Sequence, residues 1–262
     1  MPRNTRSDVS VRVLGCGDAF GSGGRSHTSF YLQTPTTRLL IDFGASALVS
    51  MHRFGVDPGT IDAVVLSHLH GDHFGGLPFL LLDAAFVTRR TRPLIIAGPR
   101  GTPDRLRRTT ELLFPAFWRT HGRSHVRFIE LADRRPRQVA GATVTPFAVV
   151  HKSGAPAFAL RVSCNGCTVA YSGDTAWTDA LLEAARDADL FLCEASSFAT
   201  PIPYHLMYQT IAAHRKDIRA ARLVLTHLGP EMLSRRSKLA VECATDGQRI
   251  AIRRRATGHS KR

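Results

Sequence analysis

Short runs in which apolar and polar residues alternate open the chain, and this period of two is typical of half-buried β-strands. The runs that predict strands in the first half lie at 9–14, 29–33, 38–43, 61–67 and 93–97. Longer segments with the apolar spacing of helices lie at 45–54, 76–90 and about 103–117. The first half is therefore expected to form a sheet whose strands are separated by helices.

The second half repeats this style of strands with intervening helices. Its predicted strands lie at 126–131, 143–150, 157–163, 168–171, 190–193, 222–226 and 249–252. Its predicted helices lie near 178–188 and 205–215. Antiparallel hairpins mixed with helices indicate an α/β fold in which two sheets pack together and helices lie outside them.

The limits of the predicted domain lie close to the two ends of the chain. Neither a linker nor a change in composition divides the 262 residues, so we expect a single domain over 9–252. A polar N-terminal segment, 1–8, and a basic C-terminal tail, 253–262, flank this domain and are expected to be mobile.

Composition and charge narrow the class of protein. With 44% hydrophobic and 21% charged residues, the chain is neither disordered nor of low complexity. Its apolar runs fall short of the ~20 residues of a membrane span, and no secretory signal opens the chain, so a cytoplasmic location without membrane contact is expected. The formal charge of +14 favours anionic partners, although a solvated basic surface is the simpler interpretation.

Two motifs that resemble binding sites have simpler structural interpretations. Five cysteines, an odd number, argue against a disulfide framework. Cys164 and Cys167 flank Asn165-Gly166, the signal of a two-residue hairpin turn, and no second pair completes a zinc knuckle. The glycine-rich segment 15–24 precedes a predicted strand instead of a helix, so it is expected to be a loop packed close to a site, or simply a wide turn, and not a dinucleotide-binding loop.

The segment 67–73, Ser-His-Leu-His-Gly-Asp-His, concentrates the candidate chemistry. His68, His70, Asp72 and His73 follow directly on a predicted strand. A tight loop at a strand end can turn such side chains toward a common point, so this segment can contribute ligands to two ions. Nitrogen and oxygen ligands without a thiolate suit Zn²⁺, with Mn²⁺ or Fe as substitutes.

The HxHxDH motif at 68–73 resembles the signature of the metallo-β-lactamase-fold hydrolases. Within that superfamily, the segment 14–25, LGCGDAFGSGGR, resembles the first motif of the ribonuclease Z-like phosphodiesterases. The resemblance covers about 11–252. It implies a four-layer αββα sandwich, with two mixed sheets inside and helices outside.

The resemblance also implies a pair of divalent metal ions, most simply Zn²⁺, with Mn²⁺ or Fe as alternatives. Three isolated residues match the remaining family ligands, and each ends an apolar run: His151, Asp174 and His227. Asp174 matches the carboxylate that bridges the two ions. The implied ligands are His68, His70, His151 and Asp174 for one ion, and Asp72, His73, His227 and Asp174 for the other.

Two further residues have catalytic roles that the resemblance implies. Cys193-Glu194-Ala195-Ser196 resembles a His-Glu-Ala-Thr element of ribonuclease Z-like enzymes, and His205 opens the counterpart of a following His-Ser-Thr element. Glu194 would then orient His205, and His205 would protonate the leaving group or steady a phosphate oxygen. The loop departs from the family pattern at Cys193 and at Leu206-Met207. A salt bridge for Glu194 and helix capping for His205 remain the structural alternatives.

The predicted reaction is hydrolysis of a small or cyclic phosphodiester, or of a short single-stranded nucleic acid, by a hydroxide that the two ions share. Asp72 could take up the proton. Ribonuclease Z carries a tRNA-gripping arm between the third histidine and the bridging aspartate, whereas only 23 positions separate His151 from Asp174 here, so tRNA processing with such an arm is not expected. The alternatives are hydrolysis at the carbonyl of a thioester, lactone or lactam, and a nucleic-acid-binding module with little turnover. A homodimer is left open.

Overall fold

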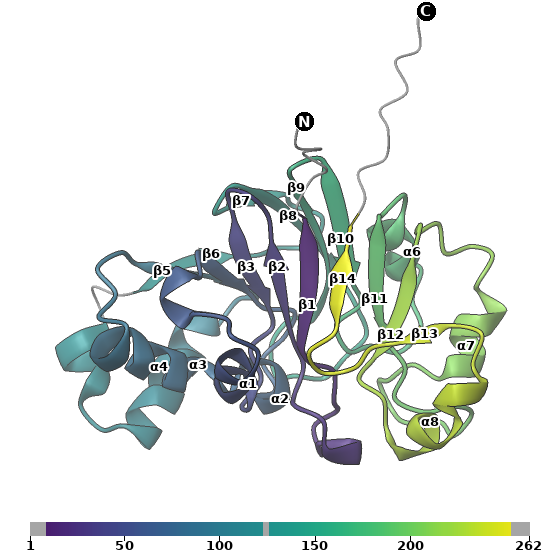
Figure 1. Ribbon diagram of the computed structural model, residues 1–262, viewed down its shortest axis with the longest axis horizontal. Coiled ribbons are helices and arrows are strands. Elements are labelled where there is room, and N and C mark those ends of the chain that lie inside the picture. Colours follow the sequence, from purple (N-terminus) through teal and green to yellow (C-terminus); the bar gives the residue numbers. More distant parts are fainter. Residues whose placement is uncertain (1–8, 123–125, 253–262) are drawn as a thin grey trace, which may run out of the picture.

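The computed structural model describes residues 9–122 and 126–252, and two mixed β-sheets form the centre of this part of the chain (Figure 1). The expectations on 1–8 and 253–262 lie outside the described residues. Each sheet has seven strands. The first half of the chain and the last strand build one sheet, and the rest of the second half builds the other.

The first sheet has the strand order β14-β1-β2-β3-β4-β5-β6. Its strands are β1 (Ser10–Gly15), β2 (Ser29–Gln33), β3 (Arg38–Ile41), β4 (Ala63–Val65), β5 (Leu94–Gly98), β6 (Val126–Glu130) and β14 (Arg249–Ala251). Pairing is antiparallel from β14 to β3 and parallel from β3 to β6. The carboxyl ends of the parallel strands therefore meet at one edge, where ligand-binding side chains are usually presented in α/β sheets.

The second sheet has the strand order β13-β12-β11-β10-β9-β8-β7. Its strands are β7 (Arg137–Val139), β8 (Ala142–Ala148), β9 (Phe158–Cys164), β10 (Cys167–Tyr171), β11 (Leu190–Glu194), β12 (Leu223–Thr226) and β13 (Glu242–Cys243). Pairing is antiparallel from β7 to β10 and parallel from β10 to β13. Both sheets thus combine a hairpin region with a parallel region.

Short helices flank the two sheets on their outer sides (Figure 1). The α-helices are α1 (Ala47–Arg53), α2 (Gly71–Phe74), α3 (Leu77–Leu82), α4 (Thr102–Leu113), α6 (Ala180–Ala185), α7 (Tyr208–Ala213) and α8 (Pro230–Arg235). The 3₁₀ segments are η1 (Ser22–Gly24), η2 (Pro58–Thr60) and η5 (Arg236–Lys238), and the π-helical segments are η3 (Asp83–Val87) and η4 (Trp118–Gly122).

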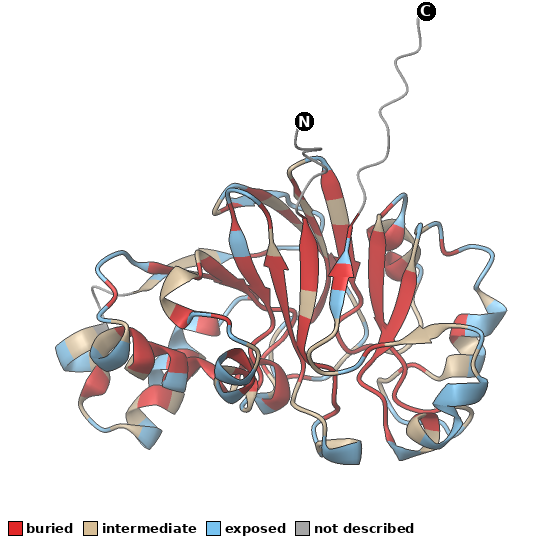
Figure 2. Cartoon of the chain, viewed as in Figure 1, coloured by how far each residue is buried: buried red, intermediate tan, exposed pale blue. Residues whose placement is uncertain are grey.

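Three apolar clusters hold these layers together. The central cluster lies between the sheets and contains side chains from both, such as Val11, Leu39, Leu160 and Val224. The other two clusters join the outer face of each sheet to its helices. Buried residues accordingly follow the strands, and exposed ones follow the outer helices and turns (Figure 2). These layers confirm the predicted αββα sandwich.

Two predicted helices differ from the observed elements. The helix predicted at 76–90 ends at Leu82 and continues as the π-helical η3. The helix predicted at 205–215 begins only at Tyr208, because Met207 forms a β-bridge with Ser197. His205 therefore lies in the loop before α7, where its backbone N–H donates to the carbonyl of Ile202 at 3.1 Å.

The two motifs with simple structural interpretations form the turns expected of them. Asn165 and Gly166 both have left-handed backbone angles, φ 48° and 73°, as a type I′ turn requires, and they join β9 to β10. Within the described part of the chain, no disulfide joins Cys164 to Cys167. The glycine-rich segment leads into β2 through a wide turn. Among the described residues, no helix has both the length and the apolar character needed to cross a membrane.

Candidate metal centre

The seven residues that the sequence proposed as metal ligands converge at one edge of the two sheets. His68 and His70 lie in the loop after β4, and Asp72 and His73 lie in α2, which begins directly after that loop. The other three lie in the second half of the chain, each just after the end of a strand: His151 follows β8, Asp174 follows β10, and His227 follows β12. Strand ends from both sheets thus bring residues up to 159 positions apart in the sequence (68 and 227) to one place.

Among the described residues, ligand atoms within 4.8 Å of one another form four overlapping groups, and two of these groups together contain all seven proposed ligands. The first group consists of three imidazoles, His68, His70 and His151. In it, the Nδ1 of His70 and the Nε2 of His151 are 3.0 Å apart. The second group consists of Asp72, His73, Asp174 and His227.

Asp174 lies between these groups. Its Oδ2 is 3.3 Å from the Nε2 of His73, 3.4 Å from the Nε2 of His227 and 3.9 Å from the Nε2 of His68. Asp72 completes the second group, because its Oδ2 lies 3.1 Å from the Nε2 of His73 and 3.2 Å from that of His227. One carboxylate is thus within reach of ligand atoms of both groups.

Three buried polar atoms of this cluster have no hydrogen-bond partner: the Nε2 of His68, the Nε2 of His73 and the Oδ1 of Asp174. Buried polar atoms are nearly always satisfied, and these three point into a cluster of nitrogen and oxygen ligands without a thiolate. The site therefore fits divalent ions such as Zn²⁺, Mn²⁺ or Fe.

The ring nitrogens on the far side of the imidazoles are held by other groups of the protein. The Nδ1 of His73 donates to Asp42 at 2.7 Å, and the Nδ1 of His68 lies 3.0 Å from the hydroxyl of Ser67. The Nδ1 of His151 donates to the carbonyl of Tyr204 at 3.1 Å. A hydrogen bond at Nδ1 fixes the tautomer whose Nε2 lone pair is free, which is the state a metal ligand needs.

Sequence reasoning missed Asp42, which supports both groups. Its side chain is fully buried, accepts from the backbone N–H and the hydroxyl of Ser67 at 2.7 Å each, and also accepts from His73. Its backbone has a left-handed φ of 56°. The available signal was an aspartate at the end of the apolar run Leu39-Leu40-Ile41, inside the segment predicted to be a strand.

The second group carries opposite charges in a buried place. Burial by itself raises the pKa of Asp174, but the charges of His227 and His73 outweigh it and hold that pKa well below its usual range. Conversely, burial lowers the pKa of His73 and His227, but Asp174 and Asp72 raise the pKa of His73 well above its usual range and that of His227 to about 9. In the first group, burial lowers the pKa of His68 and of His151.

Glu194 and His205, the two residues with implied catalytic roles, are in contact. The Nδ1 of His205 lies 2.9 Å from Oε2 of Glu194, which is fully buried at the end of β11. The hydroxyl of Ser196 donates to the same oxygen at 2.7 Å, and the backbone N–H of Thr175 donates to Oε1. Burial lowers the pKa of His205, but the hydrogen bond and charge of Glu194 outweigh it, and that pKa is raised.

A cavity of about 300 Å³ opens onto the candidate metal ligands. His70, Asp72, Asp174, His205 and His227 line one part of it. Apolar residues line another part, among them Phe20, whose side chain is 90% exposed, and Ile202, which is 40% exposed. The cavity therefore combines a polar region at the ligands with two solvent-accessible apolar side chains.

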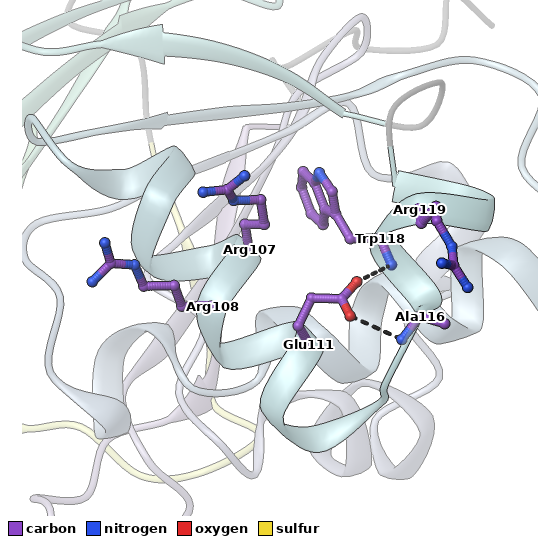
Figure 3. Close-up of a pocket in the computed structure, with 6 residues that line it drawn as sticks. All are labelled: Arg107, Arg108, Glu111, Ala116, Trp118 and Arg119. Atoms are coloured by element: carbon purple, nitrogen blue, oxygen red, sulfur yellow. Dashed lines mark hydrogen bonds between the residues drawn. The ribbon is translucent and has the colours of Figure 1, made fainter.

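A second hollow, of about 510 Å³, lies between α4 and η4, and none of its lining residues is a proposed ligand (Figure 3). Arg107, Arg108, Arg119 and Trp118 line it. Glu111 also lines this hollow, and its carboxylate accepts hydrogen bonds from the backbone N–H groups of Ala116 and Trp118 at 2.8 Å each. This hollow has a basic lining but contains none of the metal-ligating side chains.

Known proteins resemble the chain in both sequence and structure. The Mycobacterium tuberculosis protein Rv1339 is 33% identical over 234 residues, which are 85% of this chain and 81% of that protein. The probable metallo-hydrolase YhfI of Bacillus subtilis is 26% identical over 84% of this chain and 87% of its own. The crystal structure of YhfI, described as a metallo-β-lactamase fold protein, covers 93% of this chain and 99% of its own with a TM-score of 0.74 at 22% identity.

A ribonuclease is among the similar structures. The short form of human tRNase Z has a TM-score of 0.75 at 27% identity and covers 93% of this chain and 99% of its own. These findings confirm the metallo-β-lactamase fold and the likeness to the ribonuclease Z branch. A family model described as Anti-Pycsar protein Apyc1 matches residues 9–248, nearly the whole described chain. The chain therefore belongs to the Apyc1 family, within the metallo-β-lactamase fold.

Proposed function

We propose that this protein is a dinuclear metal-dependent hydrolase that cleaves a small or cyclic phosphodiester. The observation that carries the proposal is the pair of ligand groups that meet at Asp174, with three buried ligand atoms left without hydrogen-bond partners. His68, His70, His151 and Asp174 would hold one ion, and Asp72, His73, His227 and Asp174 the other. Zn²⁺ is the proposed metal, since imidazole and carboxylate ligands suit it best.

Two such ions, when bound, would lower the pKa of a water molecule and neutralise the oxygens of a phosphate. The chain would supply the proton transfers. Asp72 borders the cavity beside the ligand atoms, so we assign it the proton of the attacking water. His205 also lines the cavity, and its raised pKa favours the imidazolium that can protonate a leaving oxygen.

Glu194 would act through His205. The Nδ1 of His205 is hydrogen-bonded to Oε2 of Glu194, so the Nε2 of His205 is the ring nitrogen that would contact a substrate. Full burial of Glu194 and its bonds from Ser196 and Thr175 keep the carboxylate in one orientation. This pairing supports the catalytic interpretation of His205 over helix capping, because His205 precedes the first residue of α7 by three positions.

The size of the cavity supports a small substrate. About 300 Å³ is at the lower end of the range for small-molecule sites. The interval between His151 and Asp174 contains the β9–β10 hairpin and no long insertion, in keeping with the absence of a tRNA-gripping arm. The similar human protein is a tRNase. For this chain, the proposed substrates include a short single-stranded nucleic acid but not a tRNA.

Hydrolysis at a carbonyl is the second candidate, because the same ligands can activate a water toward carbon. Purified protein reloaded with Zn²⁺ should hydrolyse bis(4-nitrophenyl) phosphate faster than 4-nitrophenyl acetate, and Asp174→Ala should abolish both activities. Ester hydrolysis without phosphodiester hydrolysis would replace the proposal with the carbonyl reaction. Binding of an oligonucleotide that falls with salt but survives both chelation and Asp174→Ala, with no turnover, would instead support a nucleic-acid-binding module.

Exposed apolar side chains on three adjoining segments, α3, η3 and α4, support assembly into a homodimer. We call them the apolar face, and they are Phe79, Phe86, Val87, Leu112 and Leu113. Clusters of exposed apolar side chains commonly mark contacts with other proteins. We propose that a second copy covers this face. Light scattering of the wild-type protein and of Leu112→Asp, which should be monomeric, tests this proposal.

The cytoplasmic location expected from the sequence stays a prediction.

A further inference from the structure

One arginine outside the ligand set contacts two separate loops at the candidate metal centre. Arg105 lies in the first half of α4 and points its guanidinium toward backbone carbonyls. Its Nη1 donates to Leu69 and to Ser153, both at 2.9 Å, and its Nη2 donates to Gly154 at 3.3 Å. A single side chain therefore ties together segments that are 84 positions apart in the sequence (69 and 153).

These carbonyls belong to the loops that carry the first ligand group. Leu69 stands between His68 and His70, and Ser153 follows His151 by two positions. The rings of His70 and His151 meet directly, with the Nε2 of His151 3.0 Å from the Nδ1 of His70, and the ring of His68 contacts both. The guanidinium thus holds, from behind, the two backbone segments whose separation sets the distance between these imidazoles.

We propose that Arg105 is a positioning residue for the metal ion of the first ligand group. The proposal rests on the dinuclear function proposed above and extends it, because it makes one ion depend on a residue that contacts neither ion. The expected effect is selective: losing the guanidinium should weaken the first ion and leave the second nearly unchanged.

The first group has less support from burial than the second. His68 is fully buried, but His70 and His151 are only partly buried, whereas in the second group His73 is fully buried and His227 is 3% exposed. The segment after His151 lies outside the regular strands and helices. Partly exposed rings on such a loop need another restraint to keep their separation, and Arg105 supplies one from a helix.

The helix that carries Arg105 is itself held firmly. Leu106 is fully buried in the cluster between the first sheet and its helices, and Thr110 and Thr102 of α4 are also buried. The loop is shaped for close approach, because a Cβ at Gly154 would lie 3.1 Å from the Arg105 Nη2, at a backbone φ of 69°. Only a planar guanidinium offers several donors in fixed directions, so lysine would replace these bonds incompletely.

The test is a Zn²⁺ titration of the full chain in competition with a chromophoric chelator. Wild-type protein should bind two ions with resolvable affinities. Arg105→Met keeps much of the aliphatic stem and removes the donors, and it should weaken one of the two affinities by about 10–100-fold, the usual effect of losing a group that orients metal ligands. The other affinity should change by less than about threefold.

Two variants on the same residue and the same helix serve as controls. Arg105→Lys should recover part of the lost affinity, since an ammonium can still donate to a carbonyl. Arg108→Met should leave both affinities unchanged, because Arg108 is exposed and pairs only with Asp104 at 3.3 Å among the described residues. Excess Zn²⁺ should restore the kcat of Arg105→Met, which a misfolded protein would not permit.

The outcomes separate this proposal from the proposed function. Wild-type protein that binds fewer than two ions would overturn the dinuclear function itself, and the role of Arg105 with it. Two ions bound to Arg105→Met with wild-type affinities would overturn the role of Arg105 alone. An equal loss of both ions, together with a lower Tm of the metal-free variant, would show that Arg105 stabilises the fold generally, which also contradicts the proposal.

Discussion

The two ligand groups at the candidate metal centre are built by different means. The first consists of three imidazoles, two of which are partly exposed, and shares only the carboxylate of Asp174, while its loops are held mainly through backbone contacts. The second contains two carboxylates, is almost completely buried, and has side-chain partners such as Asp42 behind it. Buried carboxylates that are already in place attract a divalent ion strongly. We therefore expect the second group to bind its ion with higher affinity than the first.

The largest effect is expected where the two groups meet. Asp174→Ala removes the only residue whose carboxylate reaches ligand nitrogens of both groups within the described chain. We expect loss of at least one Zn²⁺ per chain and a fall in kcat/KM of more than about 10³-fold. Elemental analysis and phosphodiester kinetics measure the two. A variant that retains two ions and most activity would contradict the bridging position.

A change at His205, whose ring contacts those of His151 and His227, should affect the reaction more than the binding of the metal ions. We expect His205→Ala to lower kcat by about 10²–10⁴-fold on substrates with a poor leaving group, and by less when the leaving group needs no proton. The raised pKa of His205 means that the activity it supports is present below that pKa and lost as pH rises through it. The basic limb of the kcat profile should therefore disappear in the variant, while metal content stays at the wild-type value.

Asp42 offers a way to weaken the second group from behind. Asp42→Asn keeps the shape of the side chain but removes the charge that the Nδ1 of His73 contacts. Because Ser67 also donates to Asp42 and touches His68, a smaller effect should reach the first group. We expect the tighter Zn²⁺ affinity to fall by about 10–100-fold. A larger loss at the weaker ion would reverse the comparison between the groups.

The last comparison of the two groups needs no substitution, because it uses pH alone. His73 and His227 have raised pKa values, the latter about 9, so they hold protons in the metal-free state and must release them before their Nε2 atoms can bind an ion. Affinity at the second group should therefore increase as pH rises from 7 toward 9, by up to about tenfold per unit for each released proton. His68 and His151 have lowered pKa values, so the first group should change little over this range. Calorimetry in buffers of different ionisation enthalpy counts the protons.

Local sequence patterns predicted many of the strands and turns of the fold. The alternation at 29–33 matches β2 residue for residue, and Asn165-Gly166 forms the expected turn, because both signals act between neighbours in the chain. The helix predicted at 76–90 was wrong in its second part, where π-helical geometry replaces the α-helix. Such a change depends on packing against other layers, which a periodic pattern does not contain.

Some of the candidate ligands could be recognised from a local motif, whereas others could not. The motif at 68–73 is dense enough to indicate metal chemistry by itself, since imidazoles and a carboxylate rarely gather without a function. His151, Asp174 and His227 lie apart as single polar residues after apolar runs, and the family resemblance was needed to select them. Asp42 and Arg105 had no motif, because their contacts are with residues that lie far away in the sequence.

The sequence by itself determined the type of chemistry, because the donor atoms that a metal needs are properties of the side chains. Most of the order of strands and helices could also be predicted, since it follows from local periodicity. Only the tertiary structure decided which residues stand behind the ligands, how the two groups differ in burial and charge, and how small a cavity they face. Those features arise where strand ends of two sheets meet, and that meeting is set by packing between segments separated by tens of residues or more.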